Sequence, residues 1–246
     1  MKKETRNAVS NILKECVDNT LKRIKKDATH RPFHEALLSK ELLMASAFER
    51  SFSTSFGQRA VEEISQRIAI DRGAECVRQK ETQVNIYKGA LDEITRIMGD
   101  LREGLKTPDW NAEIKKICAF KKGDTVVQRV ISDLWIKNNN HETFISIKTV
   151  KPNLDQTEIA KRDLLLLKAD DPTRNVIFGL FYNPGGEERD DYNWTIPNKI
   201  FNMLQDDCVL IGADYWNFIG GRNTYSDLLE IFSEIGESTR EQLKRL

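Results

Sequence analysis

The chain has 246 residues, 39% of them hydrophobic and 31% charged, and its 38 basic and 38 acidic residues give a formal net charge of zero. This balance excludes a chain that binds nucleic acid through bulk positive charge, so such a partner would need a locally basic surface. No apolar stretch approaches the about 18 residues that cross a membrane. The four cysteines lack C-x-x-C spacing, so we expect reduced thiols in a cytoplasmic protein.

The first 110 residues are predicted to be helical. Apolar residues at helical spacing predict helices over 5–27, over 35–48 and from about 58 to 72. A longer seam with alternating steps of three and four follows, made up of Val84, Tyr87, Leu91, Ile94, Met98, Leu101 and Leu105. This spacing is typical of a helix that packs on another helix, either within its own domain or between subunits.

After Pro108 the pattern changes to alternating strands and helices. Runs rich in β-branched and aromatic residues predict strands at 125–136, 143–150, 175–182 and 208–212. Helices are predicted at 155–169, at 198–204 and from Tyr225 onward. We therefore predict one domain over 1–246: a helical part (1–110) and an α/β core (111–246) with a mixed central sheet flanked by helices.

The most informative stretch is a predicted β-hairpin that runs from Ser132 to Lys148 through an Asn-rich turn. A lysine among β-branched residues in a central strand requires an anionic partner, because an unpaired buried ammonium is costly. Asp133 on the preceding strand is the nearest candidate. An Asp that holds a divalent cation beside a Lys that activates water is a minimal set for phosphodiester hydrolysis. The alternative is an ordinary hairpin whose lysine extends to solvent.

The order of hairpin with Asp, strand ending in x-x-Lys, helix and strand resembles the PD-(D/E)xK nuclease core. More narrowly, the chain resembles the TdeIII-type family of type II restriction endonucleases through motifs in a shared order: Pro32-Phe33-His34, Thr54-Ser55-Phe56-Gly57, Asp133-Leu134, Ile147-Lys148-Thr149, Tyr182-Asn183-Pro184 and Gly220-Gly221. This resemblance implies a Mg²⁺-dependent homodimer that cuts double-stranded DNA at a short palindrome of the GGNCC kind. Because no glycine-rich phosphate loop is present, no nucleotide cofactor is expected.

One position departs from the family's pattern. The family has an acid two residues before the lysine, where this chain has Ser146, and a hydroxyl is a poor Mg²⁺ ligand. Either the following helix supplies the missing carboxylate, from Glu158 with Asp155 and Asp163 nearby, or the site has lost its chemistry. Asp155 and Glu158 also fit a capping box at the start of that helix.

The resemblance also implies that a helix glutamate reaches the metal from the N-terminal side. Glu62 has the expected position, although Glu63 lies equally off the apolar stripe of its helix. The expected metal ligands are therefore Asp133, Glu62, Glu158 and the backbone carbonyl of Ile147. Lys148 would position or deprotonate the attacking water.

Base reading requires side chains that reach base edges in the major groove. The expected residues are Lys151, Asn153 and Gln156, which follow the active-site strand, with Arg174, Arg189 and Arg222 as further candidates. For any one of these arginines, a phosphate contact or a plain surface charge is the simpler alternative. A palindromic site implies a two-fold dimer, for which the heptad-spaced helix is one candidate interface.

Three other functions stay open. The first is a DNA-binding protein that keeps the nuclease fold without cleavage, which Ser146 favours. The second is a repair or junction-resolving nuclease with the same core. The third is a structural oligomer built on the long helix.

Overall fold

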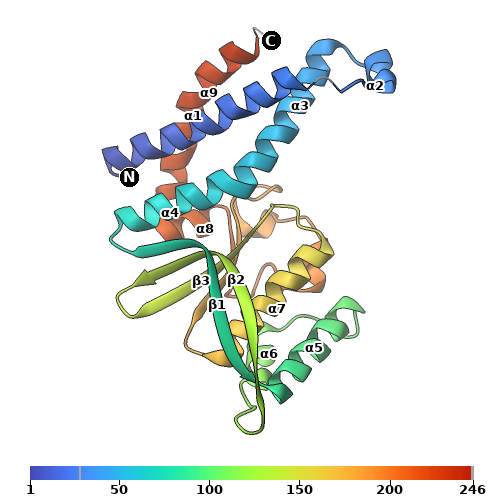
Figure 1. Ribbon diagram of the computed structural model, residues 1–246, viewed down its shortest axis with the longest axis vertical. Coiled ribbons are helices and arrows are strands. Elements are labelled where there is room, and N and C mark those ends of the chain that lie inside the picture. Colours follow the sequence, from blue (N-terminus) through green and yellow to red (C-terminus); the bar gives the residue numbers. More distant parts are fainter. Residues whose placement is uncertain (28, 245–246) are drawn as a thin grey trace.

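The computed structural model describes residues 1–27 and 29–244. The chain begins with four helices, α1 (Lys3–Lys26), α2 (Pro32–Leu37), α3 (Lys40–Ser55) and α4 (Val61–Asp71). Between α3 and α4, Phe56–Ala60 forms a π-helix, so the helical path continues through a wider turn. In Figure 1, α2 and the adjoining end of α3 lie far from the sheet, as the tip of a helical arm.

A five-stranded sheet follows, with its strands in chain order: β1 (Glu75–Tyr87), β2 (Thr125–Asn138), β3 (His141–Lys148), β4 (Asn175–Leu180) and β5 (Val209–Ile211). The first three strands are antiparallel to one another, whereas β4 pairs parallel with β3 and β5 pairs parallel with β4. The sheet is therefore mixed, as predicted.

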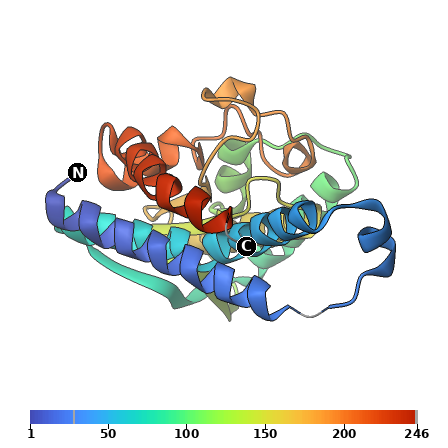
Figure 2. The ribbon, with the colours of Figure 1, turned by 90° about the horizontal axis from the view of Figure 1, so that it is seen from above.

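Helices cover both faces of this sheet (Figures 1 and 2). One face packs on α5 (Lys88–Arg102), α6 (Trp110–Ile117) and α7 (Leu154–Asp170), and its core includes Trp135, Phe144 and Phe178. The other face packs on α4 and α8 (Ala213–Gly220), with α1 and α9 (Thr224–Leu243) behind them. We call these two layers the α7 core and the α4 core.

The prediction of a wholly helical part over 1–110 is wrong in one region. Residues 75–87 form β1, which pairs along its length with β2, and Val84 and Tyr87 belong to this strand. Val84 and Ile86 are buried because alternate residues of a strand face the same side. The helix of the heptad seam begins only at Lys88.

Two smaller differences concern the C-terminal part. The helix predicted at 198–204 is a short 3-10 turn, Ile196–Lys199, and a second 3-10 turn spans Arg189–Asp191.

In the described parts of the chain, every helix is too short or too polar to span a membrane.

Candidate active site

The predicted hairpin brings Asp133 and Lys148 together. Lys148 Nζ lies 3.0 Å from Asp133 Oδ2, and both side chains are 21% exposed. The same carboxylate oxygen accepts a hydrogen bond from the backbone N–H of Ile147 at 2.6 Å and one from Ser146 Oγ at 3.4 Å. The end of β3 therefore holds one oxygen of Asp133 with three donors and leaves Oδ1 to face other groups.

Glu62 approaches Asp133 from α4. Gln79 on β1 connects the two carboxylates: its Nε2 donates to Glu62 Oε1 at 3.0 Å and lies 3.5 Å from Asp133 Oδ1. Burial raises the pKa of Glu62, and the charge of Asp133 raises it further, against the lowering effect of the Gln79 hydrogen bond.

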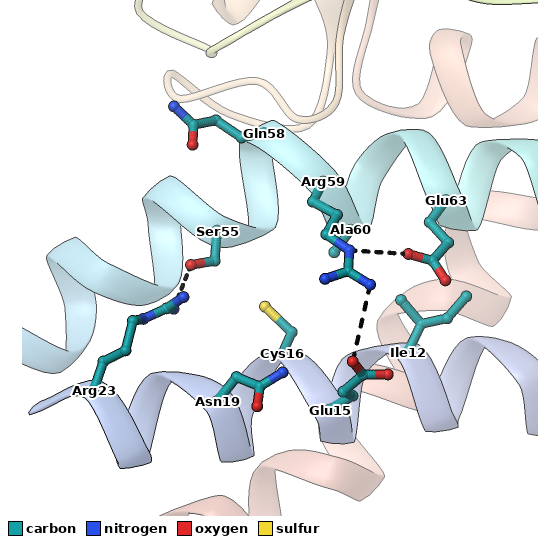
Figure 3. Close-up of a pocket in the computed structure, with 10 residues that line it drawn as sticks. All are labelled: Ile12, Glu15, Cys16, Asn19, Arg23, Ser55, Gln58, Arg59, Ala60 and Glu63. Carbon is teal, nitrogen blue, oxygen red and sulfur yellow. Dashed lines mark hydrogen bonds and ion pairs between the residues drawn. The ribbon is translucent and has the colours of Figure 1, made fainter. Parts of the chain in front are cut away.

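The neighbouring Glu63 points elsewhere. It pairs with Arg59 at 3.6 Å and with Arg78 at 3.5 Å, and Figure 3 shows Arg59 between Glu63 and Glu15 of α1. The structure thus separates two glutamates that helical phase could not distinguish, and it brings Glu62 to Asp133, as expected.

Contacts below the site fix the position of α4. Ser65 Oγ lies 2.8 Å from the hydroxyl of Tyr215 on α8, and both side chains are buried. Gln66 Nε2 donates to the carbonyl of Cys76 on β1 at 3.0 Å. Tyr215 can pack directly on the sheet because its neighbour on β4 is Gly179, where a Cβ would lie 2.8 Å from the tyrosine ring. The backbone that carries Glu62 is therefore held from two sides.

Asp163 is the carboxylate of α7 whose charge interacts with the Asp133–Lys148 pair. Burial raises its pKa to about 6; the charge of Asp133 also raises it, while Arg162 and Lys148 lower it. Its proton equilibrium therefore depends on both members of the Asp133–Lys148 pair. Among the three acids that the sequence offered on this helix, Asp163 is the one whose charge interacts with Asp133 and Lys148 and whose carboxylate is not paired with Arg102.

Glu158 and Asp155 have a partner outside the Asp133–Lys148 site. Both pair with Arg102 at the end of α5, with a distance of 3.1 Å for Asp155. The predicted capping box between these two acids is wrong, because the box that caps α7 consists of Asn153 and Gln156. The structure thus does not bring Glu158 to the Asp133–Lys148 pair.

The carboxylates suit a hard divalent cation, which prefers oxygen ligands. Within residues 1–27 and 29–244, no group of three or more His, Cys, Asp or Glu side chains is arranged so that it could hold a metal ion. Mg²⁺ does not need such a group, since it keeps several waters and uses one or two carboxylates together with substrate phosphate. Asp133 Oδ1 and Glu62 Oε1 share one amide donor, so two carboxylate oxygens already lie on one side of the site, and these residues fit the ion.

A comparison with known families matches residues 1–236 to the family model described as type II restriction endonuclease, HinfI. The chain belongs to this family. The endonuclease is 29% identical to the type II restriction enzyme HgiEI of Herpetosiphon aurantiacus. The similarity extends over 228 residues, which are 89% of this chain and 82% of the relative. The type II restriction enzyme HgiCII of the same organism is 28% identical over 238 residues, which cover 93% and 86%.

A more distant relative is the type II restriction enzyme MjaII of Methanocaldococcus jannaschii, 25% identical over 241 residues that cover 84% of this chain and 62% of the relative. The family makes the endonuclease a site-specific deoxyribonuclease whose substrate is double-stranded DNA. It confirms the predicted restriction enzyme, whereas the narrower resemblance to the TdeIII-type family stays unconfirmed.

Several of the predicted DNA-reading side chains of the endonuclease have structural partners. Arg174 pairs with Asp170 at 2.5 Å and lies at the end of the sheet away from Lys148, since the next residue, Asn175, pairs with Thr143. Arg189 donates to the backbone carbonyls of Met203 and Asp206, each at 2.9 Å.

The remaining candidates differ in how free they are. Asn153 and Gln156 use their side chains in the capping box of α7. Lys151 is exposed, with its ammonium 5.7 Å from the ring centroid of Trp194, and Arg222 is exposed after α8. Lys151 and Arg222 are therefore the candidates that DNA can reach without breaking a hydrogen bond or an ion pair to another described residue.

Proposed function

We propose that the chain is an active Mg²⁺-dependent nuclease of the PD-(D/E)xK type that hydrolyses both strands of DNA at a short palindrome. The observation that carries this proposal is the 3.0 Å contact between Lys148 Nζ and Asp133 Oδ2 on adjoining strands. The antiparallel order β1–β2–β3, with the acid on β2 and the lysine at the end of β3, supports the same assignment.

Asp133 and Glu62 are the two carboxylates that would hold the cation together with substrate phosphate, and Asp163 and the carbonyl of Ile147 would supply further oxygens. In this proposal Asp163 has the role predicted for Glu158, because Glu158 pairs with Arg102. When bound, the ion would polarise the scissile phosphate and stabilise the negative charge of the leaving oxygen.

The chain's own residues prepare the attack. The Lys148 ammonium is held beside the carboxylate, where it can orient the attacking water and offset charge that develops on the phosphate. The N–H of Ile147 fixes Asp133 in this orientation. As the water oxygen bonds to phosphorus, the bond from phosphorus to the 3′ oxygen breaks and the water proton passes to a base or to solvent.

A two-fold dimer matches a palindromic site, and we propose a homodimer for this reason. The heptad-spaced helix offers little surface for this contact, because Val84, Ile94, Met98 and Leu101 of the seam are buried in their own α7 core. The helical arm offers another surface. Phe33 and Leu37 of α2 are 82% and 83% exposed, so we propose that this tip contacts a second copy.

Cleavage and specificity are tested together by digesting a sequenced, unmethylated plasmid with Mg²⁺ or with EDTA and sequencing the cut ends. We expect discrete fragments only with Mg²⁺, with ends that share a GGNCC-like palindrome. A mobility shift without cleavage would instead support a non-cleaving DNA-binding protein. Cleavage of a branched substrate or of a plasmid that lacks the palindrome would support a repair or junction nuclease.

As a restriction enzyme, the protein would act in the prokaryotic cytoplasm, where its DNA substrate is found.

The dimer is tested by sedimentation of the Leu37→Glu variant. We expect this charge on α2 to shift the protein from dimer to monomer, because a buried unpaired carboxylate opposes association. Leu229→Glu on α9 is the matched control, since Leu229 is also exposed but lies away from the arm. An unchanged dimer in Leu37→Glu would exclude the arm tip as the interface.

A further inference from the structure

The two-stranded ribbon of β1 and β2 changes phase beside the active site. On β1, Cys76 packs in the α4 core, whereas Val84 and Ile86, which have the same place in the alternation, pack in the α7 core. On β2, Leu134 packs in the α4 core and Val130 packs in the α7 core, although these two residues also have the same place in the alternation. Side chains of a regular strand alternate without such an exchange, so both strands rotate between these positions.

Gln79 lies at the centre of this change. Arg78 pairs with Leu134 and Lys80 pairs with Ser132, but Gln79, which lies opposite Asp133, is skipped by the ladder. Its φ of 50° is in the left-handed region, where residues other than glycine are uncommon and strained. The surrounding strand pairs hold a backbone conformation here that glutamine would not choose by itself.

This backbone directs the side-chain amide at the two carboxylates. Gln79 Nε2 lies 3.0 Å from Glu62 Oε1 and 3.5 Å from Asp133 Oδ1. The amide also borders an open hollow that is lined by Glu62, Arg59 and Arg78, so ions and phosphate can reach it from solvent.

We propose that Gln79 is a positioning residue whose amide holds Glu62 against Asp133 and thereby assembles the carboxylate pair before a divalent cation binds. This inference rests on the proposed Mg²⁺-dependent function. Two carboxylates repel each other, so without the amide donor the side chain of Glu62 would turn toward solvent. A cation that binds would then have to bring Glu62 back to Asp133. The two N–H groups of the amide supply partial positive charge where the cation later supplies full charge. Contacts behind metal ligands typically change metal affinity by 10–100-fold.

The test compares Gln79→Gly with wild type and with Gln83→Gly on the same strand. Glycine adopts positive φ freely, so Gln79→Gly removes the amide while it preserves the backbone. Gln79→Asn retains an amide on a shorter side chain and tolerates the same φ. Ca²⁺ binding is measured by titration calorimetry without DNA, and cleavage is measured over a range of Mg²⁺ concentrations.

We expect Gln79→Gly to weaken Ca²⁺ binding about tenfold and to raise the half-saturating Mg²⁺ concentration to match, with the cleavage rate largely recovered at saturating Mg²⁺. Its melting temperature should not fall, and Gln79→Asn should lie between Gln79→Gly and wild type. Gln83→Gly should bind Ca²⁺ as wild type does.

Two results would overturn the inference in distinguishable ways. If wild type cleaves with Mg²⁺ and Gln79→Gly has the same metal dependence, Gln79 has no positioning role and the proposed function stands. If wild type neither binds Ca²⁺ nor cleaves with Mg²⁺, the proposed function fails and this inference fails with it.

Discussion

The molecule contains two lysine–carboxylate pairs that differ in their surroundings. Lys161 of α7 lies 2.6 Å from Glu113 Oε2 of α6, and these side chains are 0% and 7% exposed. Lys161 also donates to the carbonyl of Ile200 at 2.6 Å and lies near the rings of Trp110 and Phe201. The pair of Lys148 and Asp133 is of similar length but is open to solvent on one side.

This difference indicates two uses of the same chemistry. A ligand cannot reach the closed pair of Lys161 and Glu113. Removing either partner would leave a buried unpaired charge, so this pair stabilises the packing of α6 on α7. The open pair has Glu62 and Asp163 within electrostatic reach, and the raised pKa values of these two acids favour an added cation. The site depends on the closed pair, because α7 carries both Lys161 and Asp163.

The largest effects should separate the two lysines. Lys148→Ala should reduce the cleavage rate by about 10²–10³-fold, since it removes the charge that faces the phosphate. Its free energy of unfolding should change by less than about 1 kcal/mol, as is common for partly exposed pairs. Lys161→Ala should destabilise the fold by about 3–5 kcal/mol, because Glu113 is left buried without its partner. Plasmid cleavage and urea unfolding measure both variants. Normal cleavage by Lys148→Ala would remove this lysine from the mechanism.

A second comparison sets Asp163 against Glu158 on the same helix. Asp163→Asn should reduce cleavage by about 10²-fold if this carboxylate holds the cation, whereas Glu158→Gln should cleave at nearly the wild-type rate. Glu158→Gln should lose at most about 1 kcal/mol of stability, because its partner Arg102 is partly exposed. The opposite ranking of the two variants would restore the prediction made from the sequence.

Asp163 should also oppose folding at neutral pH. Its folded pKa of about 6 lies above its ordinary value of 3.8, so the folded state favours the protonated acid. The free energy of unfolding that depends on Asp163 therefore falls as pH rises through about 4 to 6. Without metal at pH 8, Asp163→Asn should be roughly 1–2 kcal/mol more stable than wild type, after allowance for partial exposure.

This gain should be nearly lost at pH 3.5, where the acid is protonated in the folded state and mostly protonated in the unfolded state. Urea unfolding in EDTA at the two pH values provides the measurement. An equal gain at both would show that the charge of Asp163 is not its cause.

The smallest effect is expected at Ser146. Its hydroxyl lies 3.4 Å from Asp133 Oδ2, at the long limit of a hydrogen bond, beside two shorter donors. Ser146→Ala should therefore reduce cleavage by no more than about threefold, less than one ordinary hydrogen bond provides. A loss as large as that of Lys148→Ala would instead identify the hydroxyl as a direct participant.

The sequence predicted the parts of the site that depend on local pattern. Alternation and the Asn-rich turn placed Asp133 and Lys148 on one hairpin, and register alone brings them together. The secondary structure of residues 1–110 was harder to predict from the sequence. Val84 and Tyr87 fit a helical seam and a strand equally well, so β1 was missed, and with it the position of Gln79. The short helix α8, only eight residues long, was also missed.

Side chains that depend on how elements dock could not be predicted. Which of Glu62 and Glu63 lies beside Asp133 depends on how α4 packs on β1 and α8. This packing could not be predicted from the sequence. The choice between Glu158 and Asp163 depends on the rotation of α7. That rotation buries Lys161, a residue that charge alone would place on the surface.

The π-helix at Phe56–Ala60 has an evolutionary consequence. Such a turn is what results when one residue is inserted into a regular α-helix. Deleting a single codon, for example that of Gln58, would restore a regular α-helical turn and remove the bend that a π turn commonly introduces between two helical segments, here α3 and α4. Because α4 is anchored, the change would re-aim the distal tip. In the proposed dimer through the arm tip, such a deletion would alter the spacing between the two catalytic centres, and with it the length of the DNA site, without changing a residue of either centre.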